Sequence, residues 1–307
     1  ASADEQTLLI YAASDVDPGR IFVFDRAKKT LVEAIKLRPD LKGRTLSPRR
    51  PITYPAADGT KIPGYLTLPP GVTDPKGLPA IVMPHGGPSA RDDWGFDWLS
   101  QFYAQRGFAV LQPNYRGSTG YGDEWYQENG FKSWKTSIGD ICDAGRWMVA
   151  QGMADPSKLA IVGWSYGGYA ALQVNVLDPD LFKAVVAVAP VTDLALLKAT
   201  SAAFTNSALV KDFIGSGAHI EEGSPAQNVA KFKAPVLMFH GDIDLNVDIA
   251  QARKMDKALR GAKKSSELIV YPKLEHSLVD GEVRADLLRK SDAFLRTTLK
   301  LPAATTP

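Results

Sequence analysis

Gly163-Trp164-Ser165-Tyr166-Gly167-Gly168 is the stretch that decides the fold of this 307-residue chain. The apolar run 158–162 before it predicts a strand, and the run 169–174 after it predicts a helix. A serine at a sharp strand-to-helix turn, with glycine two residues before it and two after it, is typical of a nucleophile elbow. Glycine is needed at both places because the backbone segments approach too closely there for a side chain.

Short apolar runs alternate with helical stretches over most of the chain after residue 51. This alternation predicts a mostly parallel sheet with helices on both faces, and together with the elbow it predicts an α/β-hydrolase fold. A hairpin of 52–54 and 62–68 is expected first, followed by strands over 80–83, 109–112, 159–162, 184–189, 236–239 and 268–271. Helices are expected over 97–106, 138–150, 247–260 and 281–300, and directly after the elbow.

Residues 7–37 differ from the rest of the chain, because three short apolar runs are separated there by turn residues. The pattern predicts a small antiparallel sheet. Two or three strands bury too little surface to be stable alone. We therefore expect them to lie against the main domain, to pair with another chain, or to be part of a larger β-domain. The predicted division is a β-appendage, residues 1–45, and an α/β-hydrolase domain, residues 46–307.

The composition argues against several classes of partner and cofactor. The 36 basic and 34 acidic residues leave a net charge of +2 with no long run of either sign, so neither nucleic acid nor a membrane surface is expected as a partner. A single cysteine, Cys142, excludes an internal disulfide, and with only four histidines a Cys/His metal site is not expected. No apolar run has the length of a membrane span, and the N-terminus lacks a signal-peptide pattern. We expect a soluble protein, cytoplasmic or periplasmic.

A serine hydroxyl is a weak nucleophile unless a base accepts its proton and a third group orients that base. Three of the four histidines are not at the position expected for the base. His85 lies in a glycine-rich loop, His219 in an irregular segment, and His240 at the end of a strand. His276 follows the last predicted strand and precedes the last helix. It is therefore the expected base.

The acid should lie between Ser165 and His276, because the triad of this fold runs in the order Ser, Asp, His. The predicted strand 236–239 is followed by Asp242 and Asp244, and active-site residues gather at the carboxyl ends of parallel strands. Both aspartates qualify. We favour Asp244, because Asp242 is placed to cap the turn.

The tetrahedral oxyanion of such a reaction needs two hydrogen-bond donors. The Tyr166 N–H lies at the start of the helix after Ser165, where negative charge is favoured. Gly86 and Gly87 follow a predicted strand, and in this fold such a loop supplies the second donor. Residues 194–232 do not follow the alternation of strand and helix, and we interpret them either as a lid over the substrate or as two connecting helices.

Five motifs in one order resemble the prolyl oligopeptidase family, most closely the branch of acylaminoacyl peptidases and dipeptidyl aminopeptidases. They are Val82–Pro88, Asn114–Gly122, Gly163–Tyr169, Ser224–Gln227 and His240–Asp244. The resemblance implies that Ser165 is the nucleophile, Asp244 the acid and His276 the base. It also implies that the backbone N–H groups of Tyr166 and Gly87 bind the oxyanion, and it implies no cofactor.

Members of the family carry an N-terminal β-propeller that restricts the size of the substrate. Residues 7–37 resemble the end of the last blade, and one blade cannot close a propeller. The resemblance implies a serine peptidase that acts on short or N-blocked peptides. A carboxylesterase for small acyl esters and a non-catalytic binding module are the alternatives. Through residues 7–37 we expect self-association or association with a propeller domain.

Overall fold

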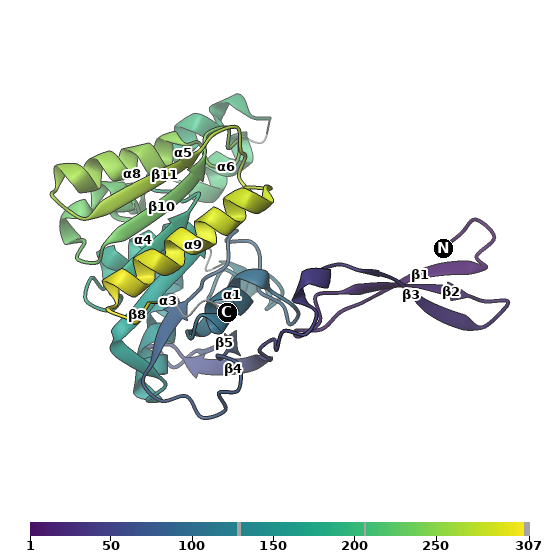
Figure 1. Cartoon of the computed structure of the whole chain (residues 1–307). Helices are drawn as coiled ribbons and strands as arrows, with labels where there is room; N and C mark the ends of the chain where they lie inside the picture. Colours follow the sequence, from purple (N-terminus) through teal and green to yellow (C-terminus); the bar gives the residue numbers. More distant parts are fainter. Residues whose placement is uncertain (128–129, 206, 304–307) are drawn as a thin grey trace.

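The main body of the protein is built on one eight-stranded sheet (Figure 1), seen in a computed structural model that describes residues 1–127, 130–205 and 207–303. The strand order is β11-β10-β9-β8-β6-β7-β5-β4. The strands are β4 (Arg49–Pro55), β5 (Lys61–Thr67), β6 (Leu78–Val82), β7 (Ala109–Pro113), β8 (Ala154–Trp164), β9 (Ala184–Val188), β10 (Val236–Gly241) and β11 (Ser266–Tyr271). Only β4–β5 and β5–β7 pair antiparallel, so the sheet is mostly parallel, as the alternation predicts.

Helices cover both faces of this sheet. One face carries α1 (Trp98–Gln105) and α9 (Gly281–Thr298), and the other carries α3 (Trp134–Ala150), α4 (Tyr166–Leu177) and α8 (Ala250–Gly261). The central strands are therefore apolar on both sides, and every residue of β9 is buried. A short α2 (Asp123–Gln127) was not predicted. Within the described residues no helix is both long and apolar enough to cross a bilayer.

The segment between β9 and β10 consists of short helices. These are α5 (Leu194–Thr200), η2 (Ser201–Ala203), α6 (Ser207–Ile214), α7 (His219–Glu222), η3 (Pro225–Gln227) and η4 (Val229–Lys231). Asp193 caps α5 by accepting a hydrogen bond from the Leu196 N–H at 2.8 Å. The segment therefore contains more and shorter helices than the two connecting helices that one of the interpretations expected.

A three-stranded antiparallel sheet projects from the main body as an arm (Figure 1). It consists of β1 (Thr7–Ala12), β2 (Arg20–Asp25) and β3 (Thr30–Lys36), and η1 (Pro39–Leu41) follows it. At the base of the arm, the Arg49 N–H donates to the Asp15 carboxylate at 2.8 Å. The strands themselves do not lie against the main sheet, so the first of the three expected arrangements is wrong for this chain.

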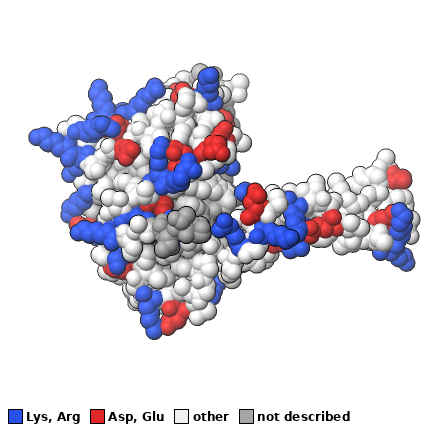
Figure 2. Space-filling view, in the orientation of Figure 1, with Lys and Arg blue, Asp and Glu red and all other residues white. Residues whose placement is uncertain are grey.

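Both faces of the arm are apolar. Directly paired residues share a face, so the register assigns Leu9, Tyr11, Ile21, Val23, Val32 and Ile35 to one face and Leu8, Ile10, Phe22, Phe24 and Leu31 to the other. Leu9 is 69% exposed, Tyr11 61% and Val32 60%. Much of the arm between its base and its tip is uncharged in the view of Figure 2. A sheet of this kind has an uncovered apolar surface on each side.

Candidate active site

Ser165 lies at the tip of a strained turn between β8 and α4. Its φ of 59° and ψ of −121° belong to a region that residues with side chains rarely adopt. A Cβ atom on Gly163 would collide with the backbone of Gly167, and one on Gly167 would collide with the Pro84 carbonyl. The two glycines of the motif are therefore required by the backbone contacts of the turn.

The glycine-rich loop after β6 lies directly against this turn. A Cβ on Gly86 would be 3.3 Å from the Ser165 Cβ. Gly87 has a φ of 119°, and a Cβ there would lie 2.7 Å from the Ser89 nitrogen, so only glycine is tolerated. Tyr166 is the first residue of α4, where backbone N–H groups have no partner within the helix. The structure thus brings the loop of Gly87 and the N–H of Tyr166 to the same side chain, that of Ser165.

Asp244 and His276 form a direct hydrogen bond. His276 Nδ1 lies 2.7 Å from Asp244 Oδ2. The other carboxylate oxygen, Oδ1, accepts from the N–H groups of Asn246 and Val247 at 2.8 and 2.9 Å. Asp242 instead accepts from the Lys273 N–H at 2.6 Å, so it holds the neighbouring turn and is not the partner of the imidazole. Of the two aspartates left open by the sequence, the structure places Asp244 against His276.

His276 is also tied to the elbow through its backbone. The Trp164 indole Nε1 donates to the His276 carbonyl at 3.0 Å, and Trp164 directly precedes Ser165. Within the ranges that the structure describes, Ser165 and His276 form no hydrogen bond with each other. Catalytic hydrogen bonds are often long in free enzymes and shorten when substrate is bound.

The environment of Asp244 keeps its carboxyl group ionised. Burial opposes ionisation, but the contacts from His240 and His276 and the Val247 N–H outweigh it and hold the pKa of Asp244 below its ordinary value. With Asp244 as an acceptor, His276 carries its hydrogen on Nδ1. Its other nitrogen, Nε2, is then the atom that can accept a proton.

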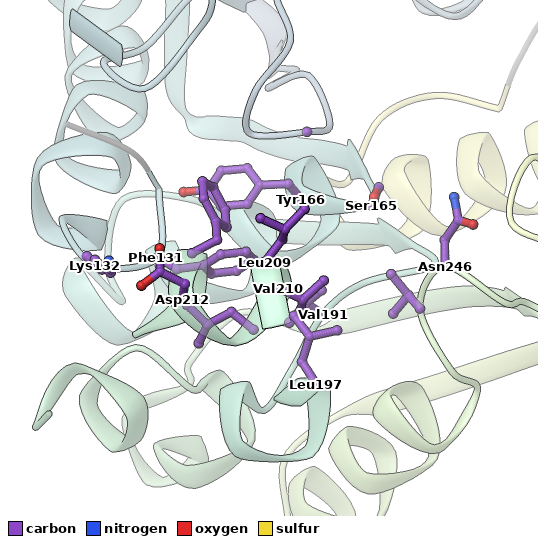
Figure 3. A pocket seen from close by; sticks show the side chains of 14 residues that line it. Phe131, Lys132, Ser165, Tyr166, Val191, Leu197, Leu209, Val210, Asp212 and Asn246 are labelled. Carbon is purple, nitrogen blue, oxygen red and sulfur yellow. The ribbon is translucent and has the colours of Figure 1, made fainter. Parts of the chain in front are cut away.

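A pocket of about 680 Å³ opens beside Ser165. Gly87, Ser165 and Tyr166 are among the residues that line it. Most of its wall is apolar, formed by Phe131, Val191, Leu197, Leu209, Val210, Phe213, Ile214 and Val247. In Figure 3 Lys132 and Asp212 lie at the end opposite Ser165, with Leu209 and Val210 between them and the serine. The pocket can accept an apolar side chain next to the serine hydroxyl.

Much of the pocket wall comes from residues that the sequence did not single out. Leu197 belongs to α5 and Val210 to α6, so the segment between β9 and β10 contacts the site, as the lid interpretation expects. Phe131 and Lys132 come from a different part of the chain, and no motif marked them. In the sequence they are recognisable only as an apolar and a basic residue shortly before α3.

His85 holds the glycine-rich loop in place and is not available as a base. Its ring stacks on Tyr115 with centroids 4.4 Å apart, Nδ1 lies 2.7 Å from the Gly86 carbonyl, and Nε2 lies 2.8 Å from Ser118 Oγ. Burial lowers the pKa of His85 to about 4. The imidazole is therefore neutral at neutral pH. Because the Gly86 carbonyl can only accept, Nδ1 carries the hydrogen. The Ser118 hydroxyl beside Nε2 donates to the Tyr115 carbonyl at 2.6 Å.

The remaining candidate groups are separate from this site. Cys142 is buried in α3, and burial raises the pKa of its thiol to about 12, so it is a packing residue with no reactive thiolate. Asp248 accepts from the Ala250 N–H at 2.8 Å, at the start of α8. In the described part of the chain no three His, Cys, Asp or Glu side chains are grouped as metal ligands.

The chain is similar to one protein family and to several individual proteins of that family. The model of the prolyl oligopeptidase family matches residues 94–302. Dipeptidyl aminopeptidase BIII from Pseudoxanthomonas mexicana is 30% identical, and the match covers 96% of this chain and 45% of that protein. The acylamino-acid-releasing enzyme of Homo sapiens is 28% identical, over 78% of this chain and 34% of that protein.

A solved structure of a puromycin-hydrolyzing peptidase from Mycobacterium tuberculosis has a TM-score of 0.85 at 25% identity, and the match covers 97% of this chain and 46% of that one. The predicted α/β-hydrolase fold with a small antiparallel sheet at its N-terminus is thus confirmed. The chain spans less than half of the length of each of these three proteins.

Replacing His85 by glutamine should reduce the loss of unfolding free energy that occurs when the pH is lowered from 7 to 5. The folded-state pKa of His85, about 4, lies below the ordinary 6.5, so between these values the unfolded chain binds a proton that the folded chain does not. Stability is then lost as the pH falls, by about 2 kcal/mol between pH 7 and pH 5 from this group alone. Urea denaturation at both pH values should show a smaller decline for His85→Gln. An equal decline in the two proteins would contradict the buried neutral imidazole.

Proposed function

Since the chain belongs to the prolyl oligopeptidase family, we propose that it is a serine hydrolase that cleaves peptide or acyl-aminoacyl bonds of short peptides. The observation that carries the proposal is the 2.7 Å hydrogen bond between His276 and the buried carboxylate of Asp244, in a loop attached to the strained turn of Ser165. A base and its orienting acid beside an elbow serine are what nucleophilic acyl transfer requires.

In the first half of the proposed reaction, Ser165 Oγ attacks the carbonyl carbon of the substrate while its proton passes to His276 Nε2. Asp244 keeps the Nδ1 hydrogen in place and stabilises the imidazolium that forms. The negative charge that develops on the carbonyl oxygen is stabilised by the N–H groups of Tyr166 and Gly87, aided by the positive end of the α4 dipole.

In the second half, the tetrahedral intermediate collapses and the bond to the leaving amine breaks. His276 gives its proton to that amine, and the acyl group stays on Ser165 as an ester. Water then attacks the ester carbonyl while His276 accepts a proton from the water. The second tetrahedral intermediate collapses, the ester bond breaks, and His276 returns that proton to Ser165 Oγ, which releases the carboxylic acid product. The proposed catalytic groups in these steps are side chains and backbone N–H groups of this chain.

The pocket indicates which acyl residue would fit. Its wall beside Ser165 is formed by apolar side chains such as Val191 and Val210, so we propose a preference for an apolar or aromatic side chain on the residue that provides the carbonyl. The names of two relatives, a dipeptidyl aminopeptidase and an acylamino-acid-releasing enzyme, support a short or N-acylated peptide as the substrate.

Substitutions in two of the three proposed catalytic side chains, Ser165 and Asp244, should remove activity and leave the fold intact. We expect Ser165→Ala and Asp244→Asn each to lower kcat by about a thousandfold or more, because the first removes the nucleophile and the second no longer fixes the tautomer of His276. Asp242→Asn is the matched control, with kcat within about threefold of wild type, because Asp242 accepts only the Lys273 N–H. Hydrolysis of a p-nitrophenyl ester measures the loss of activity, and thermal unfolding shows whether the fold is retained. Substantial turnover by Ser165→Ala would refute the assignment.

The peptidase and the esterase interpretations differ in the leaving group that the enzyme accepts. We expect the wild-type chain to cleave acetyl-Leu p-nitroanilide, an amide, as well as acetyl-Leu p-nitrophenyl ester, and to prefer the leucine amide over its aspartate analogue. The reason is that the apolar wall of the pocket stabilises the leucine side chain. Ester cleavage without amide cleavage would favour a carboxylesterase. Cleavage of neither, by a folded protein, would favour a non-catalytic binding module.

We propose that the arm formed by residues 7–37 packs between other β-sheets, either those of a propeller domain or those of a second copy of this chain. Its two exposed apolar faces and its free edge strands support this proposal. A sheet that is apolar on both sides is covered only when a neighbour stacks on each face, as happens to the blades of a propeller.

The 307-residue chain studied alone should therefore self-associate. Light scattering should give a mass that rises with concentration above the 33.2 kDa of one chain, because the uncovered faces of the arm would then bind each other. The double substitution Leu9→Lys with Val32→Lys should suppress this association, whereas Thr7→Lys, which adds a charge to β1 outside the apolar set, should not. A strictly monomeric mass for the wild-type chain would count against the proposal.

A further inference from the structure

His240 lies at the carboxyl end of β10, four residues before Asp244, and its side chain is fully buried. Its Nε2 atom is 2.8 Å from the Val247 carbonyl oxygen. A carbonyl can only accept a hydrogen bond, so Nε2 must carry a hydrogen. The same nitrogen lies 3.2 Å from Asp244 Oδ2, the oxygen that accepts from His276.

These contacts close a ring around the carboxylate of Asp244. The Val247 N–H donates to Asp244 Oδ1 at 2.9 Å, while the Val247 carbonyl accepts from His240. The Asn246 N–H also donates to Oδ1, so that oxygen is fully occupied and Oδ2 is turned toward His276. The orientation of Asp244 therefore depends on a turn that is held, through His240, by a strand in the core of the sheet.

The other nitrogen of His240 gives an independent observation. Nδ1 is buried and has no hydrogen-bond partner within the described residues. A buried polar atom without a partner is unfavourable, so packing alone does not explain an imidazole at this position. The contacts that could justify the imidazole are all made by Nε2, to the Val247 carbonyl and to the carboxylate of Asp244.

We propose that His240 is a positioning residue, which holds the Asp244–Val247 turn through its Nε2–H so that Asp244 presents Oδ2 to His276. The inference rests on the proposed function, because it gives Asp244 and His276 their catalytic roles. Among the groups that lower the pKa of Asp244 against the effect of burial, His240 acts together with His276 and the Val247 N–H. His240 itself does not contact the substrate pocket, whose lining includes Asn246 and Val247.

Two amide substitutions separate the contribution of Nε2 from that of a polar side chain in general. The amide nitrogen of glutamine can occupy the place of Nε2, whereas that of asparagine reaches only the place of Nδ1. We expect His240→Asn to lower kcat by about tenfold or more with KM within about twofold, and His240→Gln to keep kcat within about threefold of wild type. Asp242→Asn serves again as the matched control in the same loop and should keep kcat within about threefold of wild type, because Asp242 accepts from the Lys273 N–H.

Thermal unfolding and labelling of Ser165 by a fluorophosphonate report how much of each variant is folded and competent. A second measurement does not need turnover: proton NMR should show a strongly downfield Nδ1–H resonance of His276 in wild type and His240→Gln, and its loss or displacement in His240→Asn. Wild-type kcat and an unchanged resonance in His240→Asn would overturn the inference while leaving the proposed function intact. Equal losses in both amide variants would also overturn it. An inactive wild-type chain would instead refute the proposed function.

Discussion

The close approach of β8 to the first turn of α4 is the constraint on which the rest of this structure depends. It is possible only because Gly163 has no side chain, and it holds Ser165 at a φ of 59°. The absence of a side chain on Gly167 lets the loop after β6 approach the same turn. Such a conformation costs roughly 1–3 kcal/mol and persists only where the surroundings enforce it. Here β8 is paired on both sides by β6 and β9, and α4 is buried along its length, so the turn cannot relax without disturbing the core.

A second constraint is the buried negative charge of Asp244. An ionised carboxylate away from water is unfavourable unless its oxygens are satisfied, and in this protein each oxygen has partners. Backbone N–H groups occupy Oδ1, and the imidazoles of His276 and His240 lie next to Oδ2. Charge compensation and orientation are therefore achieved by the same contacts. In the loop after β10, the backbone N–H groups of Asn246 and Val247 both point to the carboxylate of Asp244.

The elbow, the mostly parallel sheet and the pairing of His276 with Asp244 could be predicted because each depends on local pattern or on chain order. Chain order narrowed the acid to Asp242 and Asp244 and favoured Asp244. The contacts of the two side chains then separate them, since Asp242 accepts from the Lys273 N–H and Asp244 accepts from His276. The pocket wall could not be predicted, because Phe131 and Val210 meet only through the packing of distant segments. The contact of His240 with Val247 was missed for a similar reason, since a histidine at a strand end has no distinctive pattern. The projection of the arm was missed because strand patterns define pairing and do not define orientation.

The proposed catalytic residues and much of the pocket wall belong to separate stretches of the chain. Ser165, Asp244 and His276 follow three strands of the central sheet, whereas Leu197, Leu209 and the other α5 and α6 residues of the pocket belong to one excursion between β9 and β10. That excursion can change in sequence without moving the strands. Divergence among such proteins could therefore alter the accepted side chain while the reaction is conserved, so substrate range and catalytic power can evolve as independent traits.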